Sequence, residues 1–251
     1  MKDSKIQWTD HTFNPWIGCT KVHTGCENCY AEELMANRYK RVEWGPTGAR
    51  SRTKNWGEPI KWNAEAMKAF RRDRVFCASL ADVFEPRDEI TPWRRDLFDL
   101  IDRCLNLDWL LLTKRPHLVN TLWPDTENRH NVWIGTSVSD QRTAEEFIFK
   151  LAMVSFGILR FLSIEPLVGP VALSDVHLRY VDWVIVGGES GPNARPLEVE
   201  WIESIVGQCK DANVPVFVKQ LGSNVDIPCQ SRKGDLLEEM PETIRYREFP
   251  S

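Results

Sequence analysis

Short apolar segments alternate with amphipathic segments along most of this sequence. The apolar segments are rich in β-branched or aromatic residues and nearly continuous in apolarity, which is typical of strands buried on both faces of a parallel sheet. Six such strands are expected, over Val75–Ala78, Trp109–Thr113, Val132–Ser137, Arg160–Ile164, Trp183–Gly187 and Val214–Lys219. A first strand near Thr12–Gly18 brings the total to about seven.

Helical patterns lie between several of these strands. Apolar residues recur at helical spacing over Pro92–Asn106, Asp140–Val154 and Glu198–Ala212. We expect Thr91 to cap the first helix with Pro92 at its first position, and Thr143 with Glu146 to form a capping box in the second. Strands that alternate with helices predict right-handed βαβ units. The expected fold is therefore α/β, a partial or full βα (TIM-like) barrel with mostly parallel strands in one domain over residues 1–251.

Polar or glycine-containing motifs follow the expected strands. In parallel α/β folds the carboxyl ends of the strands meet at one edge, and ligand sites are built there. The motifs are Ser79–Asp82, Thr113–Arg115, Thr136–Ser137, Ile164–Pro166, Gly187–Gly191 and Lys219–Gln220. One such motif would be compatible with an ordinary turn, but six in register predict a site.

Three of the seven cysteines, Cys19, Cys26 and Cys29, lie within eleven residues in the pattern C-x6-C-x2-C. Three thiolates on one loop can hold three irons of a 4Fe-4S cluster and leave the fourth iron open to a ligand. Gly18 and Gly25 would let the backbone wrap closely around such a cluster. The residues after Cys29 are expected to be helical, from Tyr30 to Arg41.

Zinc is the alternative metal for this loop. His23 lies within it, so that Cys19, His23, Cys26 and Cys29 would form a Cys3His set. Zinc motifs usually pair two CxxC-like hooks, whereas this chain has one, which favours the iron–sulfur interpretation.

A reducing compartment makes disulfides unexpected, and the apolar surroundings of three other cysteines predict that they lie in the core: Cys77, Cys104 and Cys209.

The net charge of −4 is unevenly distributed. Residues 38–74 hold eleven Lys or Arg and four Asp or Glu, a local charge of +7 that leaves −11 on the rest of the chain. Trp44, Trp56 and Trp62 interleave with these charges. Because rings stack on bases while cations hold phosphates, this insertion favours nucleotide or nucleic-acid binding. The alternatives are that the charges form a solvated helix and loop face and that the rings cover barrel edges. The candidate phosphate contacts are Arg50, Arg52 and Lys54.

The expected location is the cytoplasm. No apolar run reaches about 18 residues, so no transmembrane helix and no membrane contact are expected. The polar segment Met1–Asp10 lacks the apolar stretch of a secretory signal.

The cysteine loop, the βα alternation and the row of polar strand ends together resemble the radical SAM superfamily, in which a barrel of βα units carries a three-cysteine loop after its first strand. The whole chain also resembles a phage-associated family with this three-cysteine motif. The segments that carry the resemblance are Trp8–Asp10, Asn14–Pro15, Gly18–Cys19, Cys26–Tyr30, Leu112–Pro116, Gly135–Ser137, Ser163–Pro166, Gly187–Gly191 and Val218–Gln220.

The chain departs from the commonest superfamily pattern, C-x3-C-x2-C with an aromatic residue just before the third cysteine. Here six residues separate the first two cysteines, and the aromatic residue, Tyr30, follows the third. The Gly-Gly-Glu run that often follows the second strand is replaced by Ser79–Asp82, and a similar run, Gly187–Glu189, comes late in the chain.

The resemblance implies a radical SAM enzyme that holds a 4Fe-4S cluster on the three cysteines and S-adenosylmethionine (SAM) on the fourth iron. One electron from the cluster would cleave the sulfonium, and the resulting 5′-deoxyadenosyl radical would abstract a hydrogen atom from the substrate. A flavodoxin- or ferredoxin-like protein would donate the electron. The class of reaction stays open, and the phage association favours modification, rearrangement or repair of a nucleobase, a nucleotide or DNA.

Chemistry assigns the residues at the strand ends to parts of this scheme. The candidates for the methionine ammonium are Ser79 and Asp82, and those for its carboxylate are Lys114 and Arg115. The candidates for the ribose are Ser137 and Glu165, and those for the adenine are Gly187, Gly188 and Glu189. The expected substrate contacts are Lys219 and Gln220, beside the basic residues of the insertion.

Two other functional classes remain open. The first is a zinc-stabilised Cys3His barrel that binds nucleic acid without redox chemistry. The second is a phage partner protein with no enzymatic activity.

Overall fold

The structure is a computed structural model that describes residues 1–124, 129–155 and 159–250. Its chain divides into two compact units. The first unit comprises Met1–Lys21, Ala31–Gly135 and, of the described residues, Val154 and Ser155. The second comprises Val22–Tyr30, Thr136–Met153 and residues 159–250.

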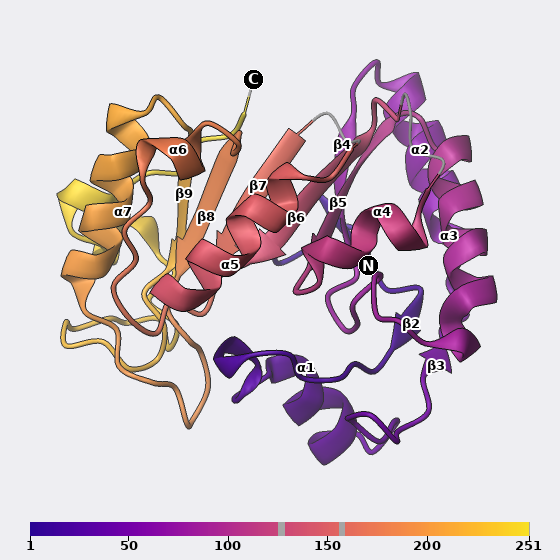
Figure 1. The fold of residues 1–251 in the computed structure, drawn as a ribbon, viewed down its shortest axis with the longest axis horizontal. Helices are drawn as coiled ribbons and strands as arrows, with labels where there is room; N and C mark the ends of the chain where they lie inside the picture. Colours follow the sequence, from indigo (N-terminus) through magenta and orange to yellow (C-terminus); the bar gives the residue numbers. More distant parts are fainter. Residues whose placement is uncertain (125–128, 156–158, 251) are drawn as a thin grey trace. The chain divides into compact units, whose positions relative to one another are not determined.

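The first unit is built on parallel strands in the order β1-β4-β5-β6. These strands are β1 (His11–Phe13), β4 (Asp73–Cys77), β5 (Leu107–Thr113) and β6 (Val132–Ser137), whose last two residues belong to the second unit. Helices α2 (Glu58–Lys68) and α3 (Thr91–Arg103) pack beside each other, and α2 also contacts β4 and β5 (Figure 1). The smaller elements are the antiparallel pair β2 (Trp16–Ile17) and β3 (Ser51–Arg52), and helix α4 (Val119–Leu122).

The second unit continues from the end of β6 in the order β6-β7-β8-β9. Strands β7 (Leu159–Ile164), β8 (Trp183–Gly187) and β9 (Val216–Gln220) pair in parallel. Helix α7 (Val199–Asp211) packs against β8 and β9, and α5 (Gln141–Ala152) packs against β7 (Figure 1). The short helix α6 (Asp175–Leu178) precedes β8.

The predicted fold class is confirmed: the chain has an α/β fold of the partial βα-barrel kind with parallel strands. The predicted strands Val132–Ser137 and Trp183–Gly187 have the bounds of β6 and β8, and the ends of the other four differ by at most two residues. The expected first strand is instead two short ones, β1 and β2, which belong to different sheets. The basic segment contains helix α2, which the sequence pattern did not predict.

The residues that cap the helices differ from those predicted. Helix α3 begins at Thr91 itself, so Thr91 is not the cap, and its hydroxyl donates to the carbonyl of Arg87. The capping box of α5 is formed by Asp140 with Thr143 rather than by Thr143 with Glu146, because the Asp140 carboxylate accepts from the Thr143 N–H. The helix expected after Cys29 is α1 (Tyr30–Glu32), which continues as the π-helical segment η2 (Glu33–Arg38).

The cores of both units are apolar and include several of the expected residues. Cys77, Cys104 and Cys209 are buried, as predicted. Trp62 is buried on α2, where its ring stacks on His11.

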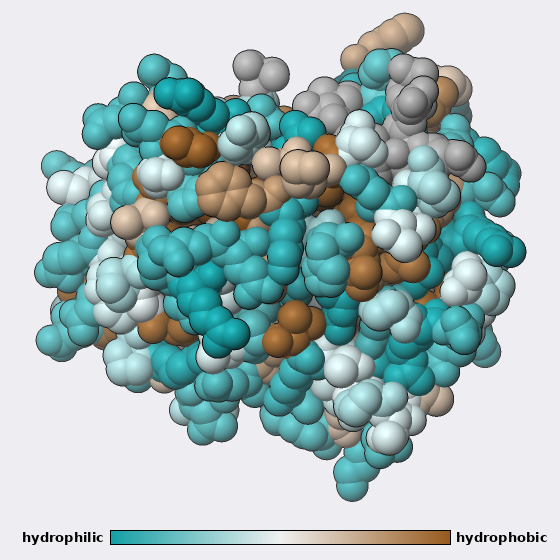
Figure 2. All heavy atoms as spheres, viewed as in Figure 1, coloured by the Kyte–Doolittle hydropathy of each residue, from teal (hydrophilic) through white to brown (hydrophobic). Residues whose placement is uncertain are grey.

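On the face drawn in Figure 2, hydrophilic side chains predominate and apolar ones show between them. None of the described helices is long and apolar enough to cross a membrane.

Candidate functional site

Cys19 follows β2 in the first unit, at a point where the backbone approaches a buried side chain. Gly18 has a φ of +112°, and a Cβ on it would lie 2.8 Å from Arg50 Cδ, so only glycine fits there without strain. The N–H of Gly18 donates to the Leu80 carbonyl, and the Cys19 carbonyl accepts from the Gly45 N–H. These contacts hold Cys19 beside the carboxyl end of β4.

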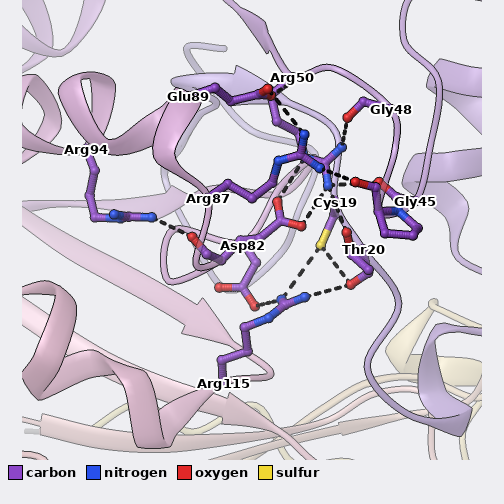
Figure 3. Close-up of polar contacts among 12 residues, drawn as sticks. Cys19, Thr20, Gly45, Gly48, Arg50, Asp82, Arg87, Glu89, Arg94 and Arg115 are labelled. Carbon is purple, nitrogen blue, oxygen red and sulfur yellow. Dashed lines mark hydrogen bonds and ion pairs between the residues drawn. The ribbon is translucent and has the colours of Figure 1, made fainter.

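Asp82 and Arg115 form a buried ion pair next to the Cys19 thiol (Figure 3). Arg115 Nη1 lies 2.8 Å from Asp82 Oδ2 and 4.0 Å from Cys19 Sγ, and Arg115 Nη2 donates to the Thr20 carbonyl at 2.8 Å. The other oxygen of Asp82 accepts from the Thr113 hydroxyl at 2.7 Å. The ends of β4 and β5 therefore converge on Cys19 through one carboxylate and one guanidinium.

Arg50 and Glu85 form a second buried pair on the other side of Cys19's loop. Arg50 donates to both carboxylate oxygens of Glu85 at 2.9 and 2.7 Å, and the two side chains are 0% and 2% exposed. The guanidinium also donates to the carbonyls of Gly45 and Gly48 and to the Thr20 hydroxyl (Figure 3). The prediction that Arg50 contacts phosphate is corrected, because a buried guanidinium with these partners faces the protein interior.

These charges act on the Cys19 thiol in opposite directions. Burial and the nearby Asp82 carboxylate raise the pKa of Cys19 to about 12, while Arg115 acts to lower it. Burial opposes the charge of Arg115, yet Asp82 raises the pKa of its guanidinium above the ordinary value. The thiol is thus protonated at neutral pH in the free chain, and binding of a metal there would displace its proton.

Cys26 and Cys29 belong to a loop of the second unit that is fixed at its start. The Gly25 N–H donates to Nδ1 of His23, whose ring packs edge-on against Phe147 of α5. The Thr24 hydroxyl donates to the carboxylate of Asp140, the cap of α5, at 3.0 Å. A Cβ on Gly25 would lie 2.0 Å from Ser139 Oγ, so this approach requires glycine.

Glu189 and Arg195 fix the other part of the same loop. Arg195 binds both oxygens of the Glu189 carboxylate, at 2.7 and 3.0 Å, and its Nη1 donates to the Thr24 carbonyl at 3.0 Å. The Asn28 amide donates to Glu189 Oε2 at 2.9 Å. Burial alone would raise the pKa of the Glu189 carboxyl, but the bonds from Arg195 and Asn28 hold it below its ordinary value.

The remaining predicted residues of the second unit lie at the carboxyl ends of its strands. Lys219 forms an ion pair with Glu165, with 2.7 Å between Nζ and Oε1, and both side chains are partly exposed. The Gln220 amide donates to the Gly188 carbonyl, and Ser137 is buried at the end of β6. The structure therefore brings Glu165, Lys219 and Gln220 to one strand edge, as the sequence predicted.

The remaining predicted residues of the first unit differ in exposure. The Ser79 hydroxyl and the Asn14 amide bond each other beside the end of β4. Lys114 is half-buried, and its backbone N–H donates to the Asp82 carboxylate. Arg52 and Lys54 lie on the surface, and Arg52 stacks over the Trp56 ring at 4.2 Å while pairing with Asp96.

Sequence reasoning missed three residues of these networks: Glu85, Arg195 and Asn28. Arg195 lies 171 positions from Thr24 in the chain, and nothing in its local sequence indicates that partner. Glu85 carried a weak signal, because it follows the strand-end motif that ends at Asp82.

The three cysteines of the motif are of the kind that holds an iron–sulfur cluster. Cys19, Cys26 and Cys29 are all free of disulfides. The loop of Cys19 is held by buried charged pairs and that of Cys26 and Cys29 by a partly buried one, so the thiols suit thiolate ligands of a cluster. Nδ1 of His23 accepts a backbone hydrogen bond, which fits a loop histidine better than a zinc ligand. Within residues 1–124, 129–155 and 159–250 no three His, Cys, Asp or Glu side chains are already grouped around a metal position.

Comparison with known proteins gives a family and a fold. A family model described as "Protein of unknown function (DUF5131)" matches residues 3–250. The chain belongs to this family. No curated protein sequence matches it.

Among solved structures, the chain is similar to a double mutant of spore photoproduct lyase with bound AdoMet and dinucleoside spore photoproduct. The TM-score is 0.50 at 12% sequence identity, and the match covers 74% of this chain. It covers 58% of the lyase chain, so this protein spans less than two thirds of that relative. At this identity the similarity establishes the fold alone, and it agrees with the partial βα barrel expected from the sequence.

Proposed function

We propose that this protein is a radical SAM enzyme that holds a 4Fe-4S cluster on Cys19, Cys26 and Cys29 and acts on a nucleobase, a nucleotide or DNA. The observation that carries the proposal is the setting of Cys19. Its thiol lies against the Asp82–Arg115 pair at the carboxyl ends of two parallel strands, in a fold shared with a lyase solved with AdoMet. Sites of parallel α/β folds are built at such ends.

The residues of the first unit divide into positioning groups and candidate SAM contacts. Asp82 and Arg115 are engaged with each other and with the loop of Cys19, so they position the thiol. Lys114 is then the candidate for the carboxylate of the methionine group, and Ser79 is the candidate for its ammonium. Cys19, Cys26 and Cys29 would hold the cluster, which when bound would supply the electron for reductive cleavage of SAM.

The residues of the second unit have corresponding roles. Ser137 and Glu165 are the candidates for the ribose, and the backbone of Gly187 and Gly188 is the candidate for the adenine. Lys219 and Gln220 remain the proposed substrate contacts. Lys219 is partly exposed and paired with Glu165. Its ammonium can therefore donate to a polar substrate and keep its charge balanced by the Glu165 carboxylate.

A substrate of the nucleic-acid class is supported by two observations. The lyase of similar fold was solved with a dinucleoside. In this chain, Arg52 stacks on Trp56 at the surface, and such platforms suit bases and phosphates. We place the protein in the cytoplasm, where a flavodoxin- or ferredoxin-like protein would supply the electron.

Anaerobic purification followed by iron, sulfide and zinc analysis tests the metal. The proposal predicts a brown protein with about four irons per chain, and loss of iron and colour in Cys26→Ala. Cys229→Ala is the matched control, because this half-exposed cysteine lies outside the motif, and it should keep the iron. A colourless protein with one zinc would contradict the proposal and favour the Cys3His alternative. A protein without metal would favour a non-enzymatic partner protein.

A further inference from the structure

Glu189 and Arg195 form a bidentate ion pair in the second unit, next to the loop of Cys26 and Cys29. Glu189 is 6% exposed, and its carboxylate is bound in bidentate fashion by Arg195, whose backbone N–H also donates to Oε2 at 2.9 Å. Bidentate guanidinium–carboxylate bonds fix both distance and orientation. The pair is therefore a rigid point to which a loop can be attached.

The cysteine loop is attached at this point on both sides of Cys26. Before it, the Thr24 carbonyl accepts from Arg195 Nη1 at 3.0 Å, and after it the Glu27 carboxylate lies 3.1 Å from the same nitrogen. Next to Cys29, the Asn28 amide bridges Glu189 Oε2 and the Asn193 carbonyl, at 2.9 and 2.8 Å.

These contacts occupy the groups that a SAM-binding Glu189 would need. Its Oε2 accepts from Asn28 and twice from Arg195, and its Oε1 accepts from Arg195. A ligand N–H group, such as the amino group of adenine, would have to displace these partly buried, charge-assisted bonds to reach the carboxylate, which is costly.

We infer that Glu189 and Arg195 form a clamp that positions the thiols of Cys26 and Cys29, and that the glutamate of the late Gly-Gly-Glu run serves the cysteine loop rather than the cofactor. Cys19 has a separate clamp of the same chemistry, Asp82 with Arg115. The inference rests on the proposed function only for what the thiols bind, since the clamp orders the loop in the metal-free chain as well.

Pulsed alkylation of the metal-free, reduced protein with iodoacetamide tests the clamp without any cluster. Trypsin cleavage after Lys21 and Arg38 releases one peptide with Cys26 and Cys29, and tandem mass spectrometry separates the two sites. Cys19 reports the other clamp, while the buried Cys77 and Cys209 report global unfolding. The variants are Arg195→Met and Arg195→Lys, with the exposed Arg179→Met as the matched control.

Arg195→Met is expected to raise the alkylation rates of Cys26 and Cys29 about tenfold, because local opening of the loop no longer breaks the charge-assisted bonds of Arg195. Cys19, Cys77 and Cys209 should keep their rates, and Arg179→Met should change none. Arg195→Lys should rescue in part, because one ammonium cannot bind both carboxylate oxygens and the Thr24 carbonyl. Unchanged rates at Cys26 and Cys29, or an equal rise at Cys19, would overturn the clamp.

Asn28→Ala keeps the test decisive if Arg195→Met unfolds and exposes Cys77. This change removes only the bonds of a loop amide, so the fold is retained, and alkylation at Cys29 should accelerate. An unchanged Cys29 rate would overturn the clamp. Because neither readout involves iron or SAM, failure of the clamp is distinguishable from failure of the proposed radical chemistry.

Discussion

Arg115 and Asp82 meet through Nη1 and Oδ2 at 2.8 Å, and the same Arg115 nitrogen lies 4.0 Å from the Cys19 sulfur. Asp82 is itself fixed by the Thr113 hydroxyl and by the N–H of Phe84. A chain of short polar contacts thus runs from the ends of β4 and β5 to the first cysteine. Such outer partners orient metal ligands and tune their affinity.

Replacement of Arg115 by Met should weaken iron binding in the reconstituted protein. The change leaves Asp82 without its cation and Cys19 without its guanidinium neighbour, and losses of this kind lower metal affinity about 10- to 100-fold. Iron retained after a timed chelator challenge measures the effect. Arg115→Lys should retain more iron than Arg115→Met and less than the unchanged protein. Equal iron retention in all three proteins would show that Arg115 does not act on the cluster.

Replacement of Glu85 by Gln should destabilise the first unit strongly. Arg50 would keep a buried positive charge without its carboxylate, which costs about 3–5 kcal/mol. Urea unfolding followed by fluorescence measures the free energy of unfolding. The surface pair Arg52–Asp96 offers the control, because Asp96→Asn should change the stability by only ~0–1 kcal/mol. Similar effects of the two substitutions would contradict the assignment of Arg50 to the interior.

Nucleic-acid binding should depend on Arg52 and Lys54 and not on Arg50. Each lost phosphate contact lowers the salt slope of log Kd by about 1. Fluorescence anisotropy with a labelled single-stranded oligonucleotide, repeated over a salt series, gives the slope for Arg52→Ala and Lys54→Ala. A slope that matches the unchanged protein in both variants would remove this surface from the substrate site.

Asp140 should stabilise helix α5 in a pH-dependent manner. Burial opposes its charge, but bonds from Thr143 and Thr24 hold the pKa of its carboxyl below the ordinary value. The stabilisation is therefore complete above the unfolded pKa of about 3.9 and is lost as the pH falls through the lower folded pKa.

Asp140→Ala should cost about 1 kcal/mol at neutral pH through loss of the cap. Asp140→Asn keeps a side-chain acceptor and should cost less. Urea unfolding at neutral pH and below pH ~4 measures both. The difference in the free energy of unfolding between the unchanged protein and Asp140→Asn should become smaller in acid. A larger difference in acid would contradict the lowered pKa of Asp140.

The strands were predictable because their signal is local. A buried parallel strand is a short run of apolar residues, and such runs located six of the seven strands of the parallel sheet. The same reasoning placed Asp82 and Arg115 at one edge, where they form an ion pair. The bounds of helix α2 were not predicted, because the charged residues of the basic segment indicated only a solvated helix and loop face.

The networks that hold the cysteines were not predictable, since their partners are distant in sequence. Arg50 lies in a basic run that suggests a solvated face, and its burial depends on Glu85, 35 positions away. Glu189 lies in a run that suggests a cofactor contact, but Arg195 and Asn28 surround it. Pairing of charges is set by tertiary structure, and composition does not reveal it.

The most direct test of the radical SAM proposal is the formation of 5′-deoxyadenosine. Reconstituted protein is incubated anaerobically with SAM and dithionite, with and without a thymidine-containing oligonucleotide, and the nucleoside is quantified by chromatography. We predict its formation by the unchanged protein and by Cys229→Ala, and its loss in Cys26→Ala. A protein with a full complement of iron that forms no 5′-deoxyadenosine under either condition would contradict the account.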